Sequence, residues 1–356
     1  MFDSSLEADA ISVIVCTHTL ERWEYLRAAV DSVRAQTLAP AETIVVIDGN
    51  AALERRARAE LEGVEVLRNL HTPGLSGGRQ SGAERARGSI LAFLDDDAVA
   101  DRDWLQRLAD VYRDPLVLGV GGAIDPAWEQ PPPRWFPAEF NWVIGCSYVG
   151  MPTSAQRVRN VIGANMSMRA TVLAQAGAFD SRLGRAAGAR ALSGSAEETE
   201  LCIRAARQHP GHYWIYEPRA RVVHSVPPQR GTWRYFVRRC GVEGTAKAVL
   251  SGIAGAQDGL SSERRYVRSV LPRAVGRELA GAVRGHPDGL ARASAITAGL
   301  AITAAAYGRG RWALSNRSRR PAGDRGTPPQ GPQVAPGDHA HTPAPAGAPA
   351  SEPLTP

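Results

Sequence analysis

Lysine is almost absent from this sequence. Lysine and arginine together number 42, and Lys247 is the only lysine, so the positive charge is carried almost entirely by arginine. Arginine makes forked contacts to phosphate that lysine cannot make. The chain is also rich in alanine, glycine and proline, however, and a compositional bias explains the arginines more simply. The net charge of +6 and the isoelectric point of about 9.4 suit nucleic acid, an anionic membrane or a phosphorylated substrate.

Cysteine is scarce as well. The four cysteines are far apart and form no CxxC pair: Cys16, Cys146, Cys202 and Cys240. A zinc site is therefore not expected, and free, buried thiols in a reducing compartment are the simplest interpretation. The N-terminal stretch MFDSSLEADA is acidic and does not resemble a secretory signal. We expect a cytoplasmic protein, with peripheral attachment to the inner face of the plasma membrane left open.

A long hydrophobic run is missing too. The apolar stretch ASAITAGLAITAAAY at 293–307 has 15 residues, fewer than the roughly 20 needed to cross a bilayer. It predicts a packed or membrane-lying helix, within an alanine-rich region that reads as helical from about 232 to 310. From 317 the chain turns to proline, glycine, alanine and threonine, which predicts a disordered tail over 317–356. We therefore divide the chain into 1–245, 246–316 and 317–356.

The first half of the chain alternates between strands and helices. ISVIVCT at 11–17, ETIVVID at 42–48 and SILAFLD at 89–95 are apolar on both faces, as expected of central strands in a parallel sheet. Helical patterns and a short strand at 64–69 lie between them. This order predicts an α/β fold with a doubly wound sheet.

The next segments continue the pattern less regularly. We predict helices at 101–113, 171–176 and 197–208, strands at 118–124 and 164–169, a proline-rich loop at 129–142, and a strand pair at 212–225. Three aromatic residues of the loop, Trp135, Phe136 and Trp142, could stack on a sugar or a lipid. They could equally fill a core, and the sequence does not decide between these roles.

Three consecutive carboxylates follow the strand at 89–95. Asp95, Asp96 and Asp97 would lie at the carboxyl edge of the sheet, where open α/β sheets bind ligands. Two carboxylates one residue apart can share a hard cation such as Mg²⁺ or Mn²⁺, which cancels their repulsion. The same cation can neutralise a diphosphate leaving group. The alternative is that they are ordinary turn and helix-start residues.

Other segments favour the site. Thr17 follows the first strand, and Asp48 ends the second. PGLSGGRQSGAERARG supplies glycines, a helix N-terminus suited to phosphate, and Arg79. SAEETELCIRAAR at 195–207 places acidic residues at the start of a helix. Taken alone, Ser195 and Glu198 form a capping-box pattern, which is a purely structural explanation.

Taken in order, these segments resemble family 2 glycosyltransferases. The resemblance runs from Ile11 to about Gly244 and includes GLSGGRQSGAERARG, ILAFLDDDA, NMSMR, GAFDSRLG and EETELCIR. It implies the GT-A fold, a Rossmann-like open mixed sheet flanked by helices, for residues 1–245. The helical region at 246–316 and the tail would then be additions, the former a candidate for membrane contact.

The resemblance also implies roles for the residues of the site. Thr17 and Asp48 would hold the base and ribose, and Arg79 would lie near the diphosphate or base. Among the acidic residues and their partners, we expect nucleotide contacts from Asp95 and Asp96, a metal held by Asp97 and Asp95 with His224 as an extra ligand, and a general base at Glu198 or Glu197. The base is left between two residues because the family commonly has Asp at the Glu198 position.

The function expected from this resemblance is inverting sugar transfer. The donor would be a nucleoside diphosphate sugar, and Mg²⁺ or Mn²⁺ would be the cofactor. The acceptor would be a saccharide or a polyprenol-linked molecule in cell-envelope polysaccharide or lipid-linked glycan synthesis. A natural-product glycosyltransferase and a sugar-phosphate nucleotidyltransferase are the alternatives, although the N-terminus lacks a Gly-rich, Lys-bearing signature. Nucleic-acid binding is not expected, because the arginines are scattered and no binding motif is present.

Overall fold

A nine-stranded mixed sheet organises the molecule. The computed structural model describes residues 10–180, 196–255 and 261–319. The sheet has the order β3-β2-β1-β4-β8-β6-β9-β5, and β7 pairs with β9 outside this path. Its strands are β1 (Ile11–Thr17), β2 (Glu42–Ile47), β3 (Glu65–Arg68), β4 (Ile90–Asp95), β5 (Ala98–Ala100), β6 (Val117–Trp128), β7 (Gln156–Val158), β8 (Asn165–Arg169) and β9 (Tyr213–Val226).

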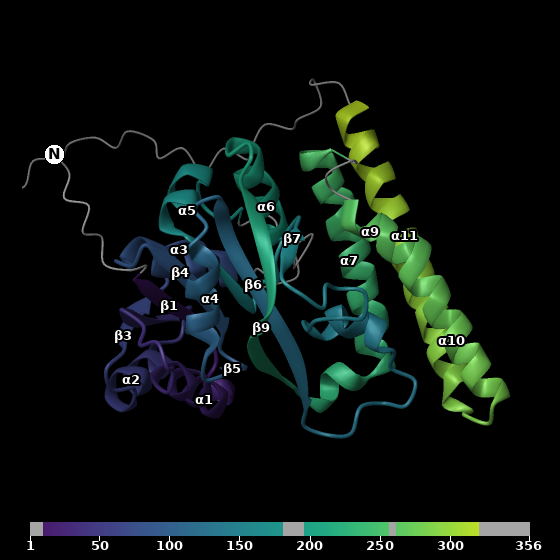
Figure 1. Cartoon of the computed structure of the whole chain (residues 1–356), viewed down its shortest axis with the longest axis horizontal. Coiled ribbons are helices and arrows are strands. Elements are labelled where there is room, and N and C mark those ends of the chain that lie inside the picture. The colour runs from purple at the N-terminus through teal and green to yellow at the C-terminus, as the bar shows by residue number, and fades with distance from the viewer. Residues whose placement is uncertain (1–9, 181–195, 256–260, 320–356) are drawn as a thin grey trace, which may run out of the picture.

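Helices cover the sheet, and a further group of helices stands at its side (Figure 1). The helices over the sheet are α1 (Trp23–Arg34), α2 (Ala51–Glu60), α3 (Leu75–Arg85), α4 (Trp104–Tyr112), α5 (Ala170–Ala176) and α6 (Glu197–Gln208). The group at the side consists of α7 (Trp233–Ala254), α9 (Ser261–Arg265), the π-helical turn η4 (Tyr266–Val270), α10 (Leu271–Val283) and α11 (Asp288–Arg319). Short 3-10 helices η1 (Leu20–Arg22), η2 (Ala138–Ile144) and η3 (Pro228–Gly231) lie in the connections.

The N-terminal half forms the predicted parallel sheet. Val15 lies opposite Val45 on one side and Leu94 on the other. All three side chains are fully or almost fully buried, as expected for strands covered by helices on both faces. The parallel β-α-β arrangement is therefore confirmed, and the carboxyl ends of β1, β2 and β4 meet at one edge.

The second half of the sheet differs from the prediction. The segment expected as a strand pair at 212–225 is a single 14-residue strand, β9. Its register against β6 shifts twice, and at the second shift Gly122 lies opposite Glu217 whereas Ala123 lies opposite Arg221. Pro218 lies inside this shift, where it cannot donate a ladder hydrogen bond. The expected loop at 129–142 contains η2, and the three-residue strands β5 and β7 were not predicted.

The C-terminal helices pack closely against one another. A Cβ atom at Gly244 of α7 would lie 2.2 Å from the carbonyl oxygen of Thr303 on α11, so this contact requires glycine. The start predicted for the tail, residue 317, falls inside α11, which continues to Arg319. Residues 320–356 lie outside the described part of the chain. The expected domain boundary at 245 falls inside α7, and the division into domains stays a prediction.

The apolar stretch at 293–307 is part of a longer apolar helix than the sequence predicts. That stretch belongs to α11, which is long and apolar enough over Asp288–Asn316 to cross a membrane by length and composition. One face of α11 nevertheless packs on protein: a Cβ atom at Gly299 would lie 2.4 Å from Phe140. The predicted helix is therefore present and packs on protein along one face, within a longer helix than expected; membrane contact by its other face stays a prediction.

Buried ion pairs attach the C-terminal helices to the sheet domain. Glu263 of α9 accepts two hydrogen bonds from Arg159, at 2.8 and 3.0 Å, and lies 2.5 Å from Lys247. Burial opposes ionisation of Glu263, but Lys247 and Arg159 lower its pKa to about 2. A second ion pair joins Arg277 of α10 to the buried Glu139. The only lysine of the chain thus has a structural role.

Candidate functional site

The topology places the three aspartates beside a histidine from the far end of the chain. Asp95 is the last residue of β4, and β5 begins at Ala98, directly after Asp97. Because β5 pairs with β9, Ala98 lies opposite His224. The backbone N–H of Ser225 also donates to the carbonyl of Asp97 at 2.8 Å. Residues far apart in sequence are therefore held together by a strand of only three residues.

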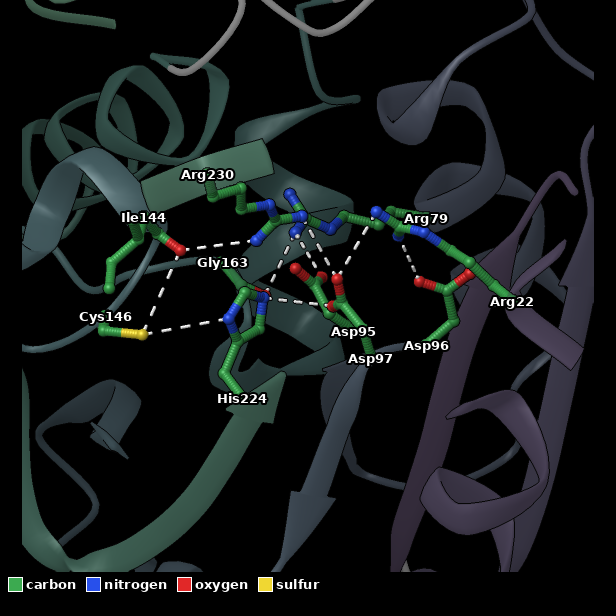
Figure 2. Close-up of polar contacts among 10 residues, drawn as sticks. All are labelled: Arg22, Arg79, Asp95, Asp96, Asp97, Ile144, Cys146, Gly163, His224 and Arg230. Atoms are coloured by element: carbon green, nitrogen blue, oxygen red, sulfur yellow. Dashed lines mark hydrogen bonds and ion pairs between the residues drawn. The ribbon is translucent and has the colours of Figure 1, made fainter. Parts of the chain in front are cut away.

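Asp97 is surrounded by basic groups (Figure 2). Its carboxylate lies 3.0 Å from Nε2 of His224, 3.2 Å from Arg230 and 3.4 Å from Arg22. Burial raises the pKa of Asp97, but the hydrogen bond and charge of His224 and the charges of both arginines outweigh it and lower the pKa below its ordinary value. Asp97 is therefore ionised and available as a ligand at neutral pH.

Asp95, Asp97 and His224 could hold a metal ion. Each offers one ligand atom, and these atoms all lie within 4.8 Å of one another. Two carboxylates and one imidazole suit Mn²⁺ and are compatible with Mg²⁺. On its other side, Nδ1 of His224 lies 3.8 Å from the thiol of the buried Cys146. This contact orients the imidazole so that Nε2 faces Asp97, as outer-shell partners commonly do in metal sites.

Asp96 lies differently from its neighbours. It is 3% exposed, binds Arg22 at 2.8 Å and does not line the pocket that contains Asp95 and Asp97. Burial is the main cause of its raised pKa. Thr17, expected to hold the nucleotide, is likewise 3% exposed and outside this pocket. In the described structure, the side chains of Thr17 and Asp96 are therefore buried next to the pocket and do not line it.

Asp48 lies at the end of β2, outside the same pocket. Its carboxylate accepts hydrogen bonds from the backbone N–H of Gly74 at 2.7 Å and from Asn69 at 2.8 Å. Gly74 is the N-cap of α3 and has φ 125°, a conformation that favours glycine. Asp48 thereby fixes the loop that leads into α3, the helix that carries Arg79.

Arg79 is a buried cation among carboxylates. Its side chain is 3% exposed, donates to the carbonyl of Gly163 at 3.0 Å, and lies 3.5 Å from Asp95 and 3.6 Å from Glu197. Burial alone would lower the pKa of Arg79, but the nearby carboxylates, Glu198 foremost, raise it overall. Arg79 thus connects the aspartate cluster to the start of α6.

Glu198 is placed differently from Glu197. Glu197 is 2% exposed and paired with Arg79, whereas Glu198 is only partly buried. The Oε2 atom of Glu198 has no hydrogen-bond partner among the described residues. The N-cap of α6 is Ala196, which makes no side-chain cap. A capping box requires Glu at the third helical residue, whereas Glu198 is the second, so the structure has no capping box at Glu198. Ser195 lies outside the described residues.

These side chains line one pocket with an empty volume of about 560 Å³ that is open to solvent. Its polar lining consists of Arg22, Arg79, Asp95, Asp97, Glu197, Glu198, His224, Arg230 and Tyr235. Sequence reasoning missed three of them, Arg22, Arg230 and Tyr235. Arg22 and Arg230 lie in the 3-10 turns that follow β1 and β9, and only that position close after a strand end could have indicated them. Tyr235 lies in the first turn of α7.

The loop aromatics do not line this pocket. Phe136 is buried and packs edge-on against Trp128 and Phe236, with ring centroids 5.3 and 5.9 Å apart. Trp135 joins the same cluster, 5.5 Å from Phe236. Trp142 donates its indole N–H to Tyr266 at 3.3 Å. Of the two interpretations left open by the sequence, the structure favours the core.

The fold and the site define a glycosyltransferase of the GT-A type. A mixed sheet flanked by helices carries an acidic Asp-x-Asp pair at the carboxyl edge of its parallel half. A solved structure with the same fold is the mannosyltransferase PcManGT from Pyrobaculum calidifontis in complex with GDP-Man and Mn²⁺. It has a TM-score of 0.54 and 18% sequence identity, over 88% of this chain and 89% of that chain.

The chain belongs to glycosyl transferase family 2. The family model matches residues 12–177. The chain is also 35% identical over 244 residues to a Glucosyl-dolichyl phosphate glucuronosyltransferase from Haloferax volcanii, a match covering 67% of this chain and 77% of the relative. Family membership supports a glycosyltransferase and removes the nucleotidyltransferase alternative.

Two further relatives match shorter stretches. The succinoglycan biosynthesis protein ExoM of Rhizobium meliloti is 30% identical over 132 residues, which cover 35% of this chain and 42% of the relative. The putative glycosyltransferase EpsH of Bacillus subtilis is 29% identical over 106 residues, which cover 29% of this chain and 30% of the relative. These two matches span less than half of either relative.

Proposed function

We propose that this protein is an inverting, metal-dependent glycosyltransferase that moves a sugar from a nucleoside diphosphate sugar to an acceptor hydroxyl or phosphate. The observation that carries the proposal is the pocket itself. On one side lie the three candidate metal ligands, within 4.8 Å of one another, and on another lies Glu198, with a carboxylate oxygen that has no partner among the described residues.

Asp95, Asp97 and His224 would hold Mg²⁺ or Mn²⁺. The ion would supply positive charge to the diphosphate as the bond to the sugar breaks. Arg22 and Arg230 lie beside Asp97 in the same pocket, so their guanidinium groups can bind diphosphate oxygens directly. Fixed positive charge of this kind stabilises a leaving group without reorganisation during the reaction.

The remaining donor-binding residues would act in two ways. Asp48 follows β2 at the same edge of the sheet and would contact the nucleotide, together with Asp95. Asp96 is buried and would hold Arg22 in place, and the buried Thr17 would act through Asp96. Arg79, also buried, would act by orienting Asp95 and the two glutamates of α6 rather than by contacting the diphosphate.

Glu198 is the better candidate for the general base. The base must accept a proton from the acceptor hydroxyl as that oxygen attacks the anomeric carbon. Glu197 is engaged with Arg79 and is only 2% exposed, which keeps it from reaching an acceptor. Glu198 lines the pocket, and its charge acts on the same guanidinium.

The acceptor we propose is a polyprenol-linked saccharide on the cytoplasmic side of a membrane. The name of the Haloferax volcanii relative contains a dolichyl phosphate-linked glucose, and ExoM is named for succinoglycan biosynthesis. Both names support a role in cell-envelope polysaccharide or lipid-linked glycan synthesis. A soluble natural-product acceptor is the competing outcome.

The test is a screen of nucleoside diphosphate sugars with Mn²⁺ or Mg²⁺, scored by release of the nucleoside diphosphate. We expect one donor class to be turned over only with a divalent ion. Glu198→Gln should abolish transfer while the donor still binds, whereas Glu197→Gln should mainly reduce stability. Wild-type turnover by the folded Glu198→Gln variant would exclude Glu198 as the base, and no binding of any donor would refute the proposed function.

A further inference from the structure

The C-terminal helices carry a group of exposed arginines and large aliphatic residues. We name the exposed residues Arg265, Arg268, Arg273, Leu279, Val283 and Arg284 the α10 face. They belong to α9, η4 and α10 and to the C-cap of α10, and α10 lies on the side of the molecule away from the sheet (Figure 1). Within the part of the chain that the structure describes, none of these four arginines forms an ion pair.

The acidic residues of this segment are turned inward. Glu263 binds Arg159 and Lys247, and its side chain is 25% exposed. Glu278 is 8% exposed and binds Arg277 and Arg292. Both carboxylates are thus neutralised within the protein. At the start of α11, Asp288 is 39% exposed and lies 3.9 Å from Arg134, which partly compensates its charge. Among the described residues, the α10 face therefore carries net positive charge.

The far end of the α10 face is apolar. Val283 is 89% exposed and Leu279, one turn earlier, is 45% exposed. Leu290, at the start of α11 across the hairpin, is 57% exposed. Large aliphatic side chains exposed together beside arginines are characteristic of helices that lie in a membrane interface. An acidic protein or a nucleic acid would bind the arginines but would leave these side chains in water.

This end of the hairpin is connected to the edge of the pocket. Arg292 of α11 donates to the carbonyl of Arg134 at 3.3 Å. The next residue, Trp135, packs against Trp233 with ring centroids 5.2 Å apart. Two residues further on, Tyr235 lines the pocket. The hairpin end is therefore joined by direct contacts to the segment that carries Tyr235.

We propose that the α10 face docks on an anionic lipid bilayer, with Leu279, Val283 and Leu290 entering the headgroup region and the arginines binding lipid phosphates. The proposal rests on the proposed function in one respect, namely that docking would present a lipid-linked acceptor to the pocket. The docking itself requires no catalysis and is tested without it.

The experiment uses the full chain and vesicles of phosphatidylcholine with or without phosphatidylglycerol. Wild-type protein should sediment with the anionic vesicles, weakly with the neutral ones, and less as salt is added. The variant R265Q/R268Q/R273Q should lose roughly a hundredfold in partition coefficient, as expected for three arginines near an anionic surface. The variant L279S/V283S should also bind more weakly, although its charge is unchanged.

The matched control removes the same charge elsewhere. Arg55, Arg102 and Arg113 are exposed and lie on the sheet domain, so R55Q/R102Q/R113Q should sediment like the wild type. All variants should unfold at the wild-type temperature and turn over a soluble acceptor at the wild-type rate.

Three results would overturn the proposal. They are failure of the wild type to bind anionic vesicles, equal losses in the two triple variants, and tighter binding of the same face to an oligonucleotide than to vesicles. The proposed function fails separately, through the absence of nucleoside diphosphate release from any donor.

Discussion

Replacing Gly163 by alanine should disable catalysis without removing any catalytic side chain. A Cβ atom at this position would lie 2.5 and 2.9 Å from the guanidinium nitrogens of Arg79 and 2.9 Å from Oε1 of Glu198. Ordinary contacts begin at 3.4 Å. The added methyl group therefore acts on the candidate base and on the cation that orients it at the same time.

The size of the effect follows from how tightly Arg79 is held. To restore ordinary contact the guanidinium must retreat by most of an ångström, yet it is enclosed by Asp95, Glu197 and the carbonyl of Gly163 itself. Glu198 has more freedom, because it is partly exposed, and should move away from the acceptor position. A misplacement of about 1 Å can cost roughly a hundredfold in rate, and overpacking costs about 1 to 3 kcal/mol in stability.

The assay measures kcat with the donor and acceptor found in the screen, together with thermal unfolding. The control is Gly241→Ala in α7, where a Cβ atom meets nothing within 4 Å; it should keep the wild-type rate and gain up to about 1 kcal/mol in stability. A folded Gly163→Ala protein with kcat within twofold of the wild type would refute the contact between Gly163, Arg79 and Glu198 as a determinant of activity.

Three further predictions follow from the same contacts. Asp97→Asn should weaken Mn²⁺ binding, measured by calorimetry, at least roughly a hundredfold, because losing a ligand should cost no less than losing an outer-shell partner. Unchanged affinity would show that Asp97 is not a metal ligand. Cys146→Val should weaken Mn²⁺ about tenfold through the orientation of the imidazole, whereas Cys146→Ser and the distant Cys240→Val should not, and equal loss in Cys240→Val would attribute the effect to packing. The lowered pKa of Glu263 means that its contribution to stability is present above the ordinary pKa of about 4.5 and is lost as the pH falls toward about 2. In Glu263→Gln, the free energy of unfolding should therefore depend less on pH in that range. An unchanged pH dependence would contradict the ion pair.

The sequence predicted the elements that have a strong local pattern. The strand at 11–17 and the helix at 197–208 have the same bounds in the structure. Both carry long apolar patterns and clear end signals. The three-residue strands β5 and β7 have neither, because such a short segment contains no measurable period. Their existence depends on pairing with β9, which is information that no local stretch contains.

Those residues of the candidate site that directly follow a strand could be predicted from the sequence. Asp95 and Asp97 come directly after an apolar strand, and this position alone indicates a ligand edge. Arg22 and Arg230 could not be recognised in the same way, since each is one arginine among many in a chain almost without lysine. The different roles of Glu197 and Glu198 were also beyond the sequence, because they depend on which carboxylate the buried Arg79 contacts.

The clustering of like charges after β4 has a structural explanation. Three adjacent carboxylates repel one another, and burial raises the cost, so each needs a compensating positive group. Asp96 has Arg22, Asp97 has His224 with Arg22 and Arg230, and Asp95 has Arg79. All of these cations except His224 are arginines, which remain charged in a buried site, where a lysine could lose its proton. A divalent ion would therefore enter a site in which each carboxylate already has a positively charged partner, and the arginines that compensate Asp97 would become available to the diphosphate that arrives with it.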